Sequence, residues 1–377
     1  MHFIHLFSVL FVFIVLIGCG NSVNHMLRST VGDTIQMKYA KLLHIVKYDD
    51  HAEVCISDPW HKGRILHKYK LVSHDDRNTV ESASNETILR IPLKKTIPFS
   101  IVYASLLKEL GCIDAIVGLT DIQYVRDSLF CYLCHTGEIT DVGNSLRPNI
   151  ERIMDVLPDA LLVSPFDDNG GYGRLESIGV PIVECVDYME DSALGRAEWI
   201  KFFGLIFGRE NVADSLFSVI DSNYCALKKL ASTEKKRPQI LMDKKTGPVW
   251  YVPGGGSTIG SIIKDANAGY AFSDNSSPGS LALSFEKVLE KAENADIWVF
   301  RYGGSEPISY ESLLEEFPGY ENLKAFKIRN CFGCNVDKTK FYEETPFHPD
   351  YLLADFIKMA HPEVNGIGGL RYFHKIK

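Results

Sequence analysis

The chain has 377 residues, enough for two domains, and 46% of them are hydrophobic while 23% are charged. These proportions are typical of a folded globular protein and exclude a disordered one. Lysines and arginines number 40 against 48 acidic residues, which leaves a net charge of -8. Because there is no basic run and no basic patch interleaved with aromatic residues, we expect no nucleic-acid partner.

The first residues predict a targeting segment. Residues 6–17 are apolar except for Ser8, a run that is too short to span a bilayer comfortably and suits a signal-peptide core. The run leads into Leu16-Ile17-Gly18-Cys19, which resembles the lipobox of bacterial lipoproteins, although no Lys or Arg precedes the apolar core. The resemblance implies a signal peptide over 1–18 and a lipid on Cys19, with an uncleaved anchor as the alternative. In both cases the folded part would lie outside the cytoplasm.

The cysteines other than Cys19 would then lie in an oxidising compartment. Four of them form two C-x-x-C pairs, Cys131/Cys134 and Cys331/Cys334. A zinc site would require the fold to join ligands that are about 200 residues apart. Local disulfides or buried free thiols are the preferred interpretation, and no metal site is predicted.

Residues 19–85 are predicted to be a tether followed by a β-rich extension. Strand signals over 35–72 flank a hairpin turn at Asp49-Asp50-His51, and the polar run 73–86 is typical of a surface loop. From residue 86 the pattern changes to strands alternating with helices, which is typical of a parallel sheet covered on both faces. The alternation continues to residue 208 and returns over 233–377, where 323–330 is taken as a strand and 350–359 as a final helix.

Between these two halves, residues 210–232 predict one long helix. Apolar residues recur there at steps of three and four, and the expected buried stripe consists of Val212, Leu216, Val219, Ile220, Tyr224 and Leu227. At 1.5 Å per residue the helix would reach about 35 Å. We therefore predict two α/β lobes with parallel sheets, 86–208 and 233–377, bridged by one long helix at 209–232.

The two halves also share a local pattern. In each, a Glu and a basic residue open a short helix, and an Asp precedes a hydrophobic strand: Glu151 and Asp159 in the first half, Glu286 and Asp296 in the second. Two matches at the same place favour a quasi-duplicated architecture.

Four segments, 90–120, 149–165, 252–272 and 285–300, together resemble the substrate-binding proteins of ABC importers that capture ferric siderophores, haem or cobalamin. The resemblance spans roughly 88–363 and leaves out the extension and both C-x-x-C pairs. It implies a non-enzymatic protein at the periplasmic face of the cell envelope, with a metal-chelate ligand held between two lobes and an ABC permease of the inner membrane as partner.

Loops that follow strands are expected to face the cleft, because ligands of open parallel sheets lie beyond the carboxyl ends of the strands. The candidate ligand-binding residues, chosen as apolar walls and as partners for carboxylates, are Tyr124, Tyr172, Arg174, Trp250, Tyr251, Arg301 and Tyr302. The glycine run 254–256 is expected to let the backbone turn beside the ligand. The sequence leaves open whether His348 is an axial ligand to haem iron or, as is more common for a His between prolines, a structural residue.

The resemblance also implies that one exposed glutamate on each lobe pairs with arginines of the permease, and Glu151 and Glu286 stand at those positions. A plainer reading is that each glutamate only favours the first turn of its helix. Two other functions remain open. One is a tetrapyrrole or metal-handling enzyme of the chelatase kind, for which Asp167 and Asp168 would be candidates. The other is a surface lipoprotein that binds protein or glycan through its extension.

Overall fold

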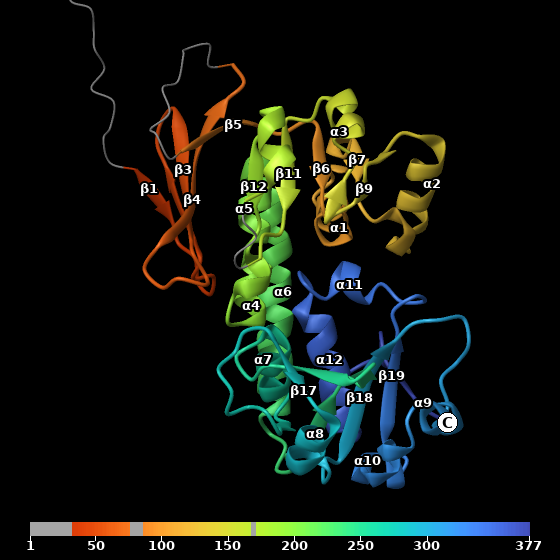
Figure 1. Ribbon diagram of the computed structural model, residues 1–377. Helices are drawn as coiled ribbons and strands as arrows, with labels where there is room; N and C mark the ends of the chain where they lie inside the picture. Colours follow the sequence, from red (N-terminus) through yellow and green to blue (C-terminus); the bar gives the residue numbers. More distant parts are fainter. Residues whose placement is uncertain (1–31, 76–85, 167–170) are drawn as a thin grey trace, which may run out of the picture.

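The computed structural model describes residues 32–75, 86–166 and 171–377. Cys19, Asp167 and Asp168 lie outside these ranges. Figure 1 shows two lobes, one above the other, with helix α6 (Glu210–Ala231) running beside both and a separate β-sheet beside the upper lobe. The predicted fold class, two α/β lobes bridged by one long helix with a β-rich extension, is confirmed.

The extension is a five-stranded sheet in the order β1-β2-β3-β4-β5, antiparallel except for the parallel pair β4–β5. Its strands are β1 (Asp33–Ile35), β2 (Leu43–Lys47), β3 (His51–Ser57), β4 (Ile65–Ser73) and β5 (Thr87–Ile91). The hairpin turn expected at residues 49–51 joins β2 to β3. Strand β5 lies beyond the sequence-based lobe boundary at residue 86 and nevertheless pairs with the extension.

Two buried carboxylates attach the extension to the N-terminal lobe. The backbone N–H groups of residues 38–40 donate to Glu198 at 2.7–3.0 Å, and those of residues 41–42 donate to Glu190 at 2.9–3.1 Å. Burial opposes the charge of Glu198, but Lys201 and these three N–H groups outweigh it and lower its pKa. The segment between β1 and β2 is irregular because its N–H groups bond to carboxylates rather than to a strand.

The N-terminal lobe is built on the parallel sheet β12-β11-β6. Every residue of β11 is buried, as expected for a parallel strand that is covered on both faces. The sheet strands are β6 (Thr96–Pro98), β11 (Ala160–Val163) and β12 (Ile182–Glu184). The helices are α1 (Ile101–Glu109), α2 (Ser128–Thr136), α3 (Ile150–Val156), α4 (Ala193–Glu198) and α5 (Ile200–Ile206), and the short strands are β7 (Gly118–Leu119), β8 (Thr140–Asp141), β9 (Gly143–Asn144) and β10 (Arg147–Pro148).

The C-terminal lobe has a sheet in the order β16-β13-β18-β19-β20, parallel except for β20, and a small antiparallel sheet β14-β15-β17. The strands are β13 (Gln239–Met242), β14 (Lys245–Thr246), β15 (Val249–Pro253), β16 (Gly269–Tyr270), β17 (Ser280–Leu283), β18 (Ile297–Tyr302), β19 (Cys331–Asn335) and β20 (His374–Lys375). The helices are α7 (Thr258–Asp265), α8 (Phe285–Ala292), α9 (Tyr310–Glu316), α10 (Lys324–Lys327), α11 (Phe341–Glu344) and α12 (Pro349–Ala360). The strand predicted at 323–330 is wrong: this segment contains α10, and the strand is β19.

The predicted helix at 210–232 is α6, and of its predicted buried stripe Ile220 and Tyr224 are buried and Leu216 and Leu227 half-buried against the core, whereas Val212 and Val219 are not. The buried residues are Ala213, Phe217, Ile220, Tyr224 and Ala231. Val212 and Val219 are 43% and 58% exposed. The difference at these two valines arises because α6 packs against α5 and α12 through small as well as large side chains, and alanine carries little weight in a hydrophobic pattern.

The two lobes repeat one local arrangement, as the sequence comparison predicted. Asp159, before β11, accepts the backbone N–H groups of residues 94 and 95 ahead of β6 at 2.8 and 2.9 Å. Asp296, before β18, accepts the N–H of Gln239 at the start of β13 at 2.8 Å. In each lobe this aspartate ties the start of one parallel strand to its neighbour.

The eight cysteines of the described residues are all free thiols. Both members of the Cys331/Cys334 pair are buried on β19, where residues three apart point to opposite faces of the sheet. Within the described ranges, no group of three His, Cys, Asp or Glu side chains is arranged to hold a metal ion. In the same ranges, none of the helices has the length and apolar character needed to cross a membrane.

Candidate ligand-binding cleft

Three adjoining hollows form a trough from the N-terminal lobe to the C-terminal lobe. The first, about 580 Å³, lies in the N-terminal lobe, and the second, about 260 Å³, shares Ser100, Ser164, Pro165 and Phe166 with it. The third, about 180 Å³, shares Val102 and Arg196 with the second and reaches α7 and α11 of the C-terminal lobe. We call the three together the trough.

The trough lies where the parallel strands end. Ser100 follows β6 and caps α1, Ser164 follows β11, and Arg301 is near the end of β18. Carboxyl ends of parallel strands are the usual ligand edge of open α/β sheets, since the chain leaves the sheet there and exposes loop residues. Each lobe turns this edge toward the other lobe.

Arg196 stands in the middle of the trough, paired with a fully buried aspartate. Its Nε donates to Asp187 Oδ2 at 2.9 Å, and the Tyr103 hydroxyl donates to Asp187 Oδ1 at 3.0 Å. Burial raises the pKa of Asp187, while Arg196 and Tyr103 act in the opposite direction. The buried carboxylate of Asp187 thus fixes the direction of the Arg196 side chain.

Arg301 has the corresponding role at the C-terminal end of the trough. It bonds to both oxygens of Asp243, at 2.9 and 2.6 Å, the planar two-point geometry that suits guanidinium and carboxylate. Burial opposes its charge, but Asp243 outweighs this and raises the pKa of Arg301. Its guanidinium carbon also lies 5.7 and 5.8 Å from the ring centres of Phe341 and Tyr342.

Two further arginines line the hollow of the N-terminal lobe, Arg147 and Arg174. Neither side chain forms an ion pair with any residue of the described ranges. Beside them are apolar surfaces, including Phe99, Leu146 and Phe166, of which Leu146 is 77% exposed. This hollow therefore offers positive charge next to apolar walls.

The structure brings only some of the predicted residues together. Tyr172 and Arg174 line the first hollow and Arg301 the third. Tyr124, 65% exposed, and Tyr251, 49% exposed, do not line the trough. Their roles in binding stay predictions.

Two of the predicted residues are placed by the structure in ways that exclude the predicted role. Trp250 is fully buried, donates its indole N–H to Met242 O at 3.0 Å and packs against Trp298, so it is a core residue rather than a wall of the cleft. Tyr302 is also buried, and its hydroxyl lies 3.2 Å from His374 Nε2 on β20. Strand alternation explains the error at Trp250, because neighbouring residues of β15 point to opposite sides.

The glycine run contacts protein rather than the trough. A Cβ on Gly254 would lie 2.2 Å from Ser277 O, and one on Gly255 would lie 2.6 Å from Asn275 O. The expectation of a turn beside the ligand is corrected: the run allows the loop 272–279 to approach the backbone.

His348 lies outside the trough, between the lobes. Its Nε2 is 2.6 Å from Glu109 Oε2 on α1 of the N-terminal lobe, and its Nδ1 is 3.7 Å from Asp350 Oδ1. Burial opposes protonation, but the carboxylates of Asp350 and Glu109 outweigh it and raise the pKa of His348 to about 9. This position fits a structural role for His348 and does not fit axial ligation of haem iron.

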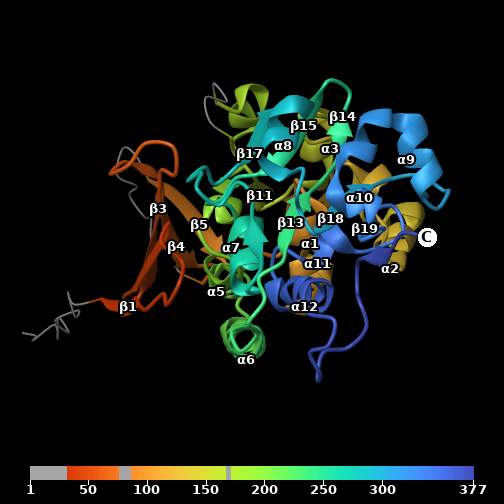
Figure 2. The same ribbon diagram turned by 90° about the horizontal axis from the view of Figure 1, so that it is seen from below.

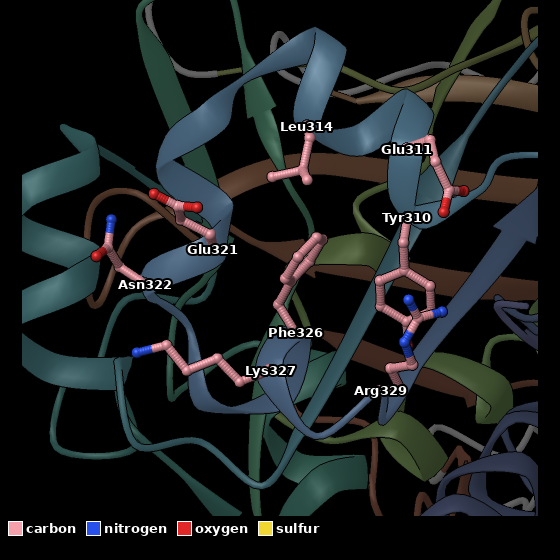
Figure 3. A pocket seen from close by; sticks show the side chains of 8 residues that line it. All are labelled: Tyr310, Glu311, Leu314, Glu321, Asn322, Phe326, Lys327 and Arg329. Carbon is pink, nitrogen blue, oxygen red and sulfur yellow. The ribbon is translucent and has the colours of Figure 1, made fainter.

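A separate hollow of about 510 Å³ lies on the C-terminal lobe, between α9, α10 and the short 3-10 helix Pro318–Asn322. Figure 3 shows Phe326 in the middle of its lining, with Arg329 beside the ring of Tyr310, 4.8 Å from the ring centre. In Figure 1 these helices are at the end of the lobe away from the N-terminal lobe. It is therefore no part of the trough.

Glu151 and Glu286 occupy the same position in their lobes. Each is exposed in the first turn of its helix, α3 or α8, behind a capping residue, Asn149 or Ser284. Figure 2 places α3 and α8 on one side of the molecule, opposite α6 and α12, while Figure 1 places them in different lobes. The helices that carry the two glutamates thus lie on one side of the molecule, one in each lobe.

The model of a known family, described as periplasmic binding protein, matches residues 102–336. The match covers more than half of the chain and includes parts of both lobes and all of α6. The chain belongs to the periplasmic binding protein family.

Relatives of similar length occur in Methanocaldococcus jannaschii. One, named an uncharacterized lipoprotein, is 26% identical over 349 residues, which cover 87% of this chain and 82% of the relative. A second relative, also named an uncharacterized lipoprotein, is 24% identical, and the match covers 90% of this chain and 87% of the relative. Both matches extend well beyond the segment that the family model covers.

Solved structures share the fold of this family member. A possible iron-binding solute-binding protein from Staphylococcus epidermidis is 19% identical with a TM-score of 0.55, covering 72% of this chain and 99% of its own. A protein of an Fe3+-hydroxamate transport system from Saccharomonospora viridis is 19% identical with a TM-score of 0.56, and the match covers 71% of this chain and 93% of that protein. An S. aureus protein complexed with haem is 16% identical with a TM-score of 0.54, and the match covers 71% of this chain and 98% of that protein. At these identities the likeness concerns the fold.

Sequence reasoning missed Arg147 and Arg196. Arg147 is the first residue of the short strand β10 and lies two residues before Asn149, which caps α3, so its place at a strand-to-helix junction could have been noticed. Arg196 is inside a helical segment, where nothing in the pattern separates a residue that faces a hollow from one that faces solvent.

Proposed function

We propose that this protein is an extracytoplasmic solute-binding protein that holds an iron complex, either a ferric siderophore or haem, or cobalamin in the trough and delivers it to an ABC permease. The observation that carries the proposal is the trough itself, which draws its lining from both lobes of a periplasmic binding protein fold. Its largest hollow, about 580 Å³, is within the range of small-molecule sites. The structural neighbour complexed with haem and the neighbour from an Fe3+-hydroxamate transport system support the same ligand class.

Within the proposed ligand class, the charges of the first hollow favour complexes that carry acidic groups. Arg147 and Arg174 have no carboxylate partner in the described ranges, so a bound carboxylate, catecholate or propionate would provide one. Arg196 and Arg301 differ, because each already bonds an aspartate. We therefore expect the first hollow to hold the charged part of the ligand.

Titration with coloured ligands tests this proposal. The purified protein would be mixed with haemin, a ferric tris-catecholate, a ferric hydroxamate and cyanocobalamin, and absorbance followed. We expect tight binding of one anionic complex, and about tenfold weaker binding in Arg174→Gln and in Arg147→Gln. Arg152→Gln, an exposed arginine on α3 that does not line the trough, is the matched control. Binding of none of the four ligands would contradict the proposal.

Delivery would use a lipid anchor and the two glutamates. The lipobox-like segment at Cys19 and the lipoprotein names of the Methanocaldococcus relatives support an anchor on this cysteine. Cys19→Ser is expected to move the protein from the membrane to the soluble fraction. Intact mass of the native protein is the direct check, because an unmodified chain beginning before Cys19 would contradict lipidation.

A further inference from the structure

One buried carboxylate joins the N-terminal β-sheet to the wall of the trough. Glu184, the last residue of β12, is 7% exposed. The Tyr172 hydroxyl, in the first hollow, donates to Glu184 Oε1 at 2.6 Å. On the other side, His67 of β4 brings its Nδ1 to 2.9 Å from Glu184 Oε2. The extension, which the family resemblance does not cover, is thus two contacts away from the ligand site.

His67 Nδ1 lies close to Glu184 Oε2 without the geometry of a directed hydrogen bond. The ring of His67 is stacked on Tyr69, 4.4 Å between centres, and its Nε2 lies 2.8 Å from Thr87 Oγ1 on β5. These two contacts set the plane of the ring, and Glu184 Oε2 is left buried without a directed hydrogen bond. A buried carboxylate oxygen in this position depends on the nearby imidazole for its stabilisation.

The same strand also holds the main chain of Glu184. The backbone N–H of Glu184 donates to the Tyr69 hydroxyl at 2.9 Å, and that hydroxyl donates to Ile182 O at 3.0 Å. Tyr69 is fully buried. Strand β4 therefore fixes both the backbone and the carboxylate of the residue that holds Tyr172. Figure 1 shows β4 and β12 as the facing elements of the extension and the N-terminal lobe.

We infer that the N-terminal sheet is a working part of the ligand site, in which His67 and Glu184 are positioning residues that hold Tyr172 on the wall of the trough. The inference rests on the proposed function and specifies the wall: an aromatic ring fixed beside Arg174, suited to a ligand with a flat or aromatic face and negative charge. A ring that is already fixed loses little conformational freedom on binding, so its contact with the ligand is gained at low entropic cost.

The position of Tyr172 can be measured without any ligand. The full chain would carry 3-fluorotyrosine at position 172, and the ¹⁹F resonance would be compared among variants. We expect Glu184→Gln and His67→Gln to shift and broaden the resonance. Ile45→Val, a conservative change at a fully buried position of β2 in the same sheet, is the control and should leave it unchanged. An unchanged resonance in both test variants would overturn the inference, whatever the ligand is.

Affinity for the complex that binds best among haemin, the ferric catecholate, the ferric hydroxamate and cyanocobalamin provides the second readout. We expect Tyr172→Phe and Glu184→Gln each to bind about tenfold less tightly, and His67→Gln several-fold less tightly. The double variant Tyr172→Phe, Glu184→Gln should bind the ligand no less tightly than Tyr172→Phe alone, since both substitutions act on the same contact between Tyr172 and Glu184.

Two outcomes separate this inference from the proposed function. If Arg174→Gln weakens binding while Glu184→Gln and His67→Gln bind as the unmodified protein does, the trough is the site and the role of the sheet is wrong. If losses in the double variant simply add, Glu184 acts independently of Tyr172, and the inference also fails. If no probe binds the unmodified protein, the proposed function fails, and the ¹⁹F comparison still decides whether the sheet positions Tyr172.

Discussion

The ammonium group of Lys340, in the C-terminal lobe, lies 2.6 Å from the carboxylate of Asp127, in the N-terminal lobe. Lys108 of α1 contacts the same Asp127 oxygen at 2.6 Å. Close by, Glu343 of α11 accepts the N–H groups of Arg126 and Asp127 at 3.0 and 3.2 Å. The lobes are therefore joined by a polar cluster at α2 and α11 in addition to α6.

Asp127→Asn should weaken this junction. Burial opposes the charge of Asp127, but Lys108 and Lys340 outweigh it and lower its pKa to about 2. An asparagine can still cap α2, so the change removes mainly the charge. We expect the free energy of unfolding to fall by about 1–2 kcal/mol at pH 7.

The pH dependence of Asp127→Asn follows from the direction of the shift. Because the pKa of Asp127 is lowered on folding, its charged carboxylate stabilises the folded protein at pH values above 3.8, the pKa in the unfolded chain. This stabilisation is lost as the pH falls toward 2. Denaturant midpoints of the two proteins should converge across that window. A gap that stays constant down to pH 2 would contradict the assignment to this carboxylate.

The contact between His348 and Glu109 predicts the opposite pH dependence. Because the pKa of His348 is raised from 6.5 to about 9, its stabilisation is complete below pH 6.5 and is lost as the pH rises through 9. Thermal midpoints of the unmodified protein should fall over this range. In His348→Gln the fall should be smaller, and equal slopes would exclude the histidine as the cause.

Trp250 and Tyr251 are neighbours on β15, and their side chains point to opposite sides of the strand. The variants Trp250→Ala and Tyr251→Ala test this difference. Trp250 is fully buried and Tyr251 is 49% exposed. Trp250→Ala should lower the free energy of unfolding by about 3–5 kcal/mol because it leaves a cavity in the core. Tyr251→Ala should change it by about 0.5 kcal/mol or less. Similar losses in both would refute the assignment of Trp250 to the core.

Gly254→Ala and Gly279→Ala test the close approach in the C-terminal lobe. The N–H of Gly254 donates to Gly279 O at 2.8 Å, so both residues belong to one contact. A methyl group on Gly254 would collide with Ser277 O, while one on Gly279 would meet its nearest atom at 4.0 Å. We expect a loss of thermal stability only in Gly254→Ala. A Gly254→Ala protein as stable as Gly279→Ala would show that the loop can move aside.

Charge reversal at Glu151 and Glu286 tests docking on the permease. The double variant Glu151→Arg, Glu286→Arg should bind ligand normally, since neither residue lines the trough, and should lose most uptake in cells. Single reversals should lose less, because exposed pairs contribute about 0.2–1 kcal/mol each. Glu290→Arg, one turn along α8, is the control. Normal uptake by the double variant would leave the glutamates with a helix-dipole role alone.

Much of the fold could be predicted from sequence because its signals are local. Periodic apolar residues defined α6, and the repeated Asp159 and Asp296 patterns revealed the two equivalent lobes. The candidate site was harder. Tyr172, Arg174 and Arg301 line the trough, whereas Trp250 and Tyr302 do not. A strand pattern tells which residues share a face, but it does not tell which face is turned toward another domain.

Most of the elements and their α/β order follow from local sequence patterns, because backbone propensity and hydrophobic period act over a few residues. Which side chains meet depends on how the elements pack. His67 and Tyr172 are about 100 residues apart in the chain and share Glu184 because three separate elements pack together. Contacts of this kind depend on the packing of whole elements, and no local pattern records them.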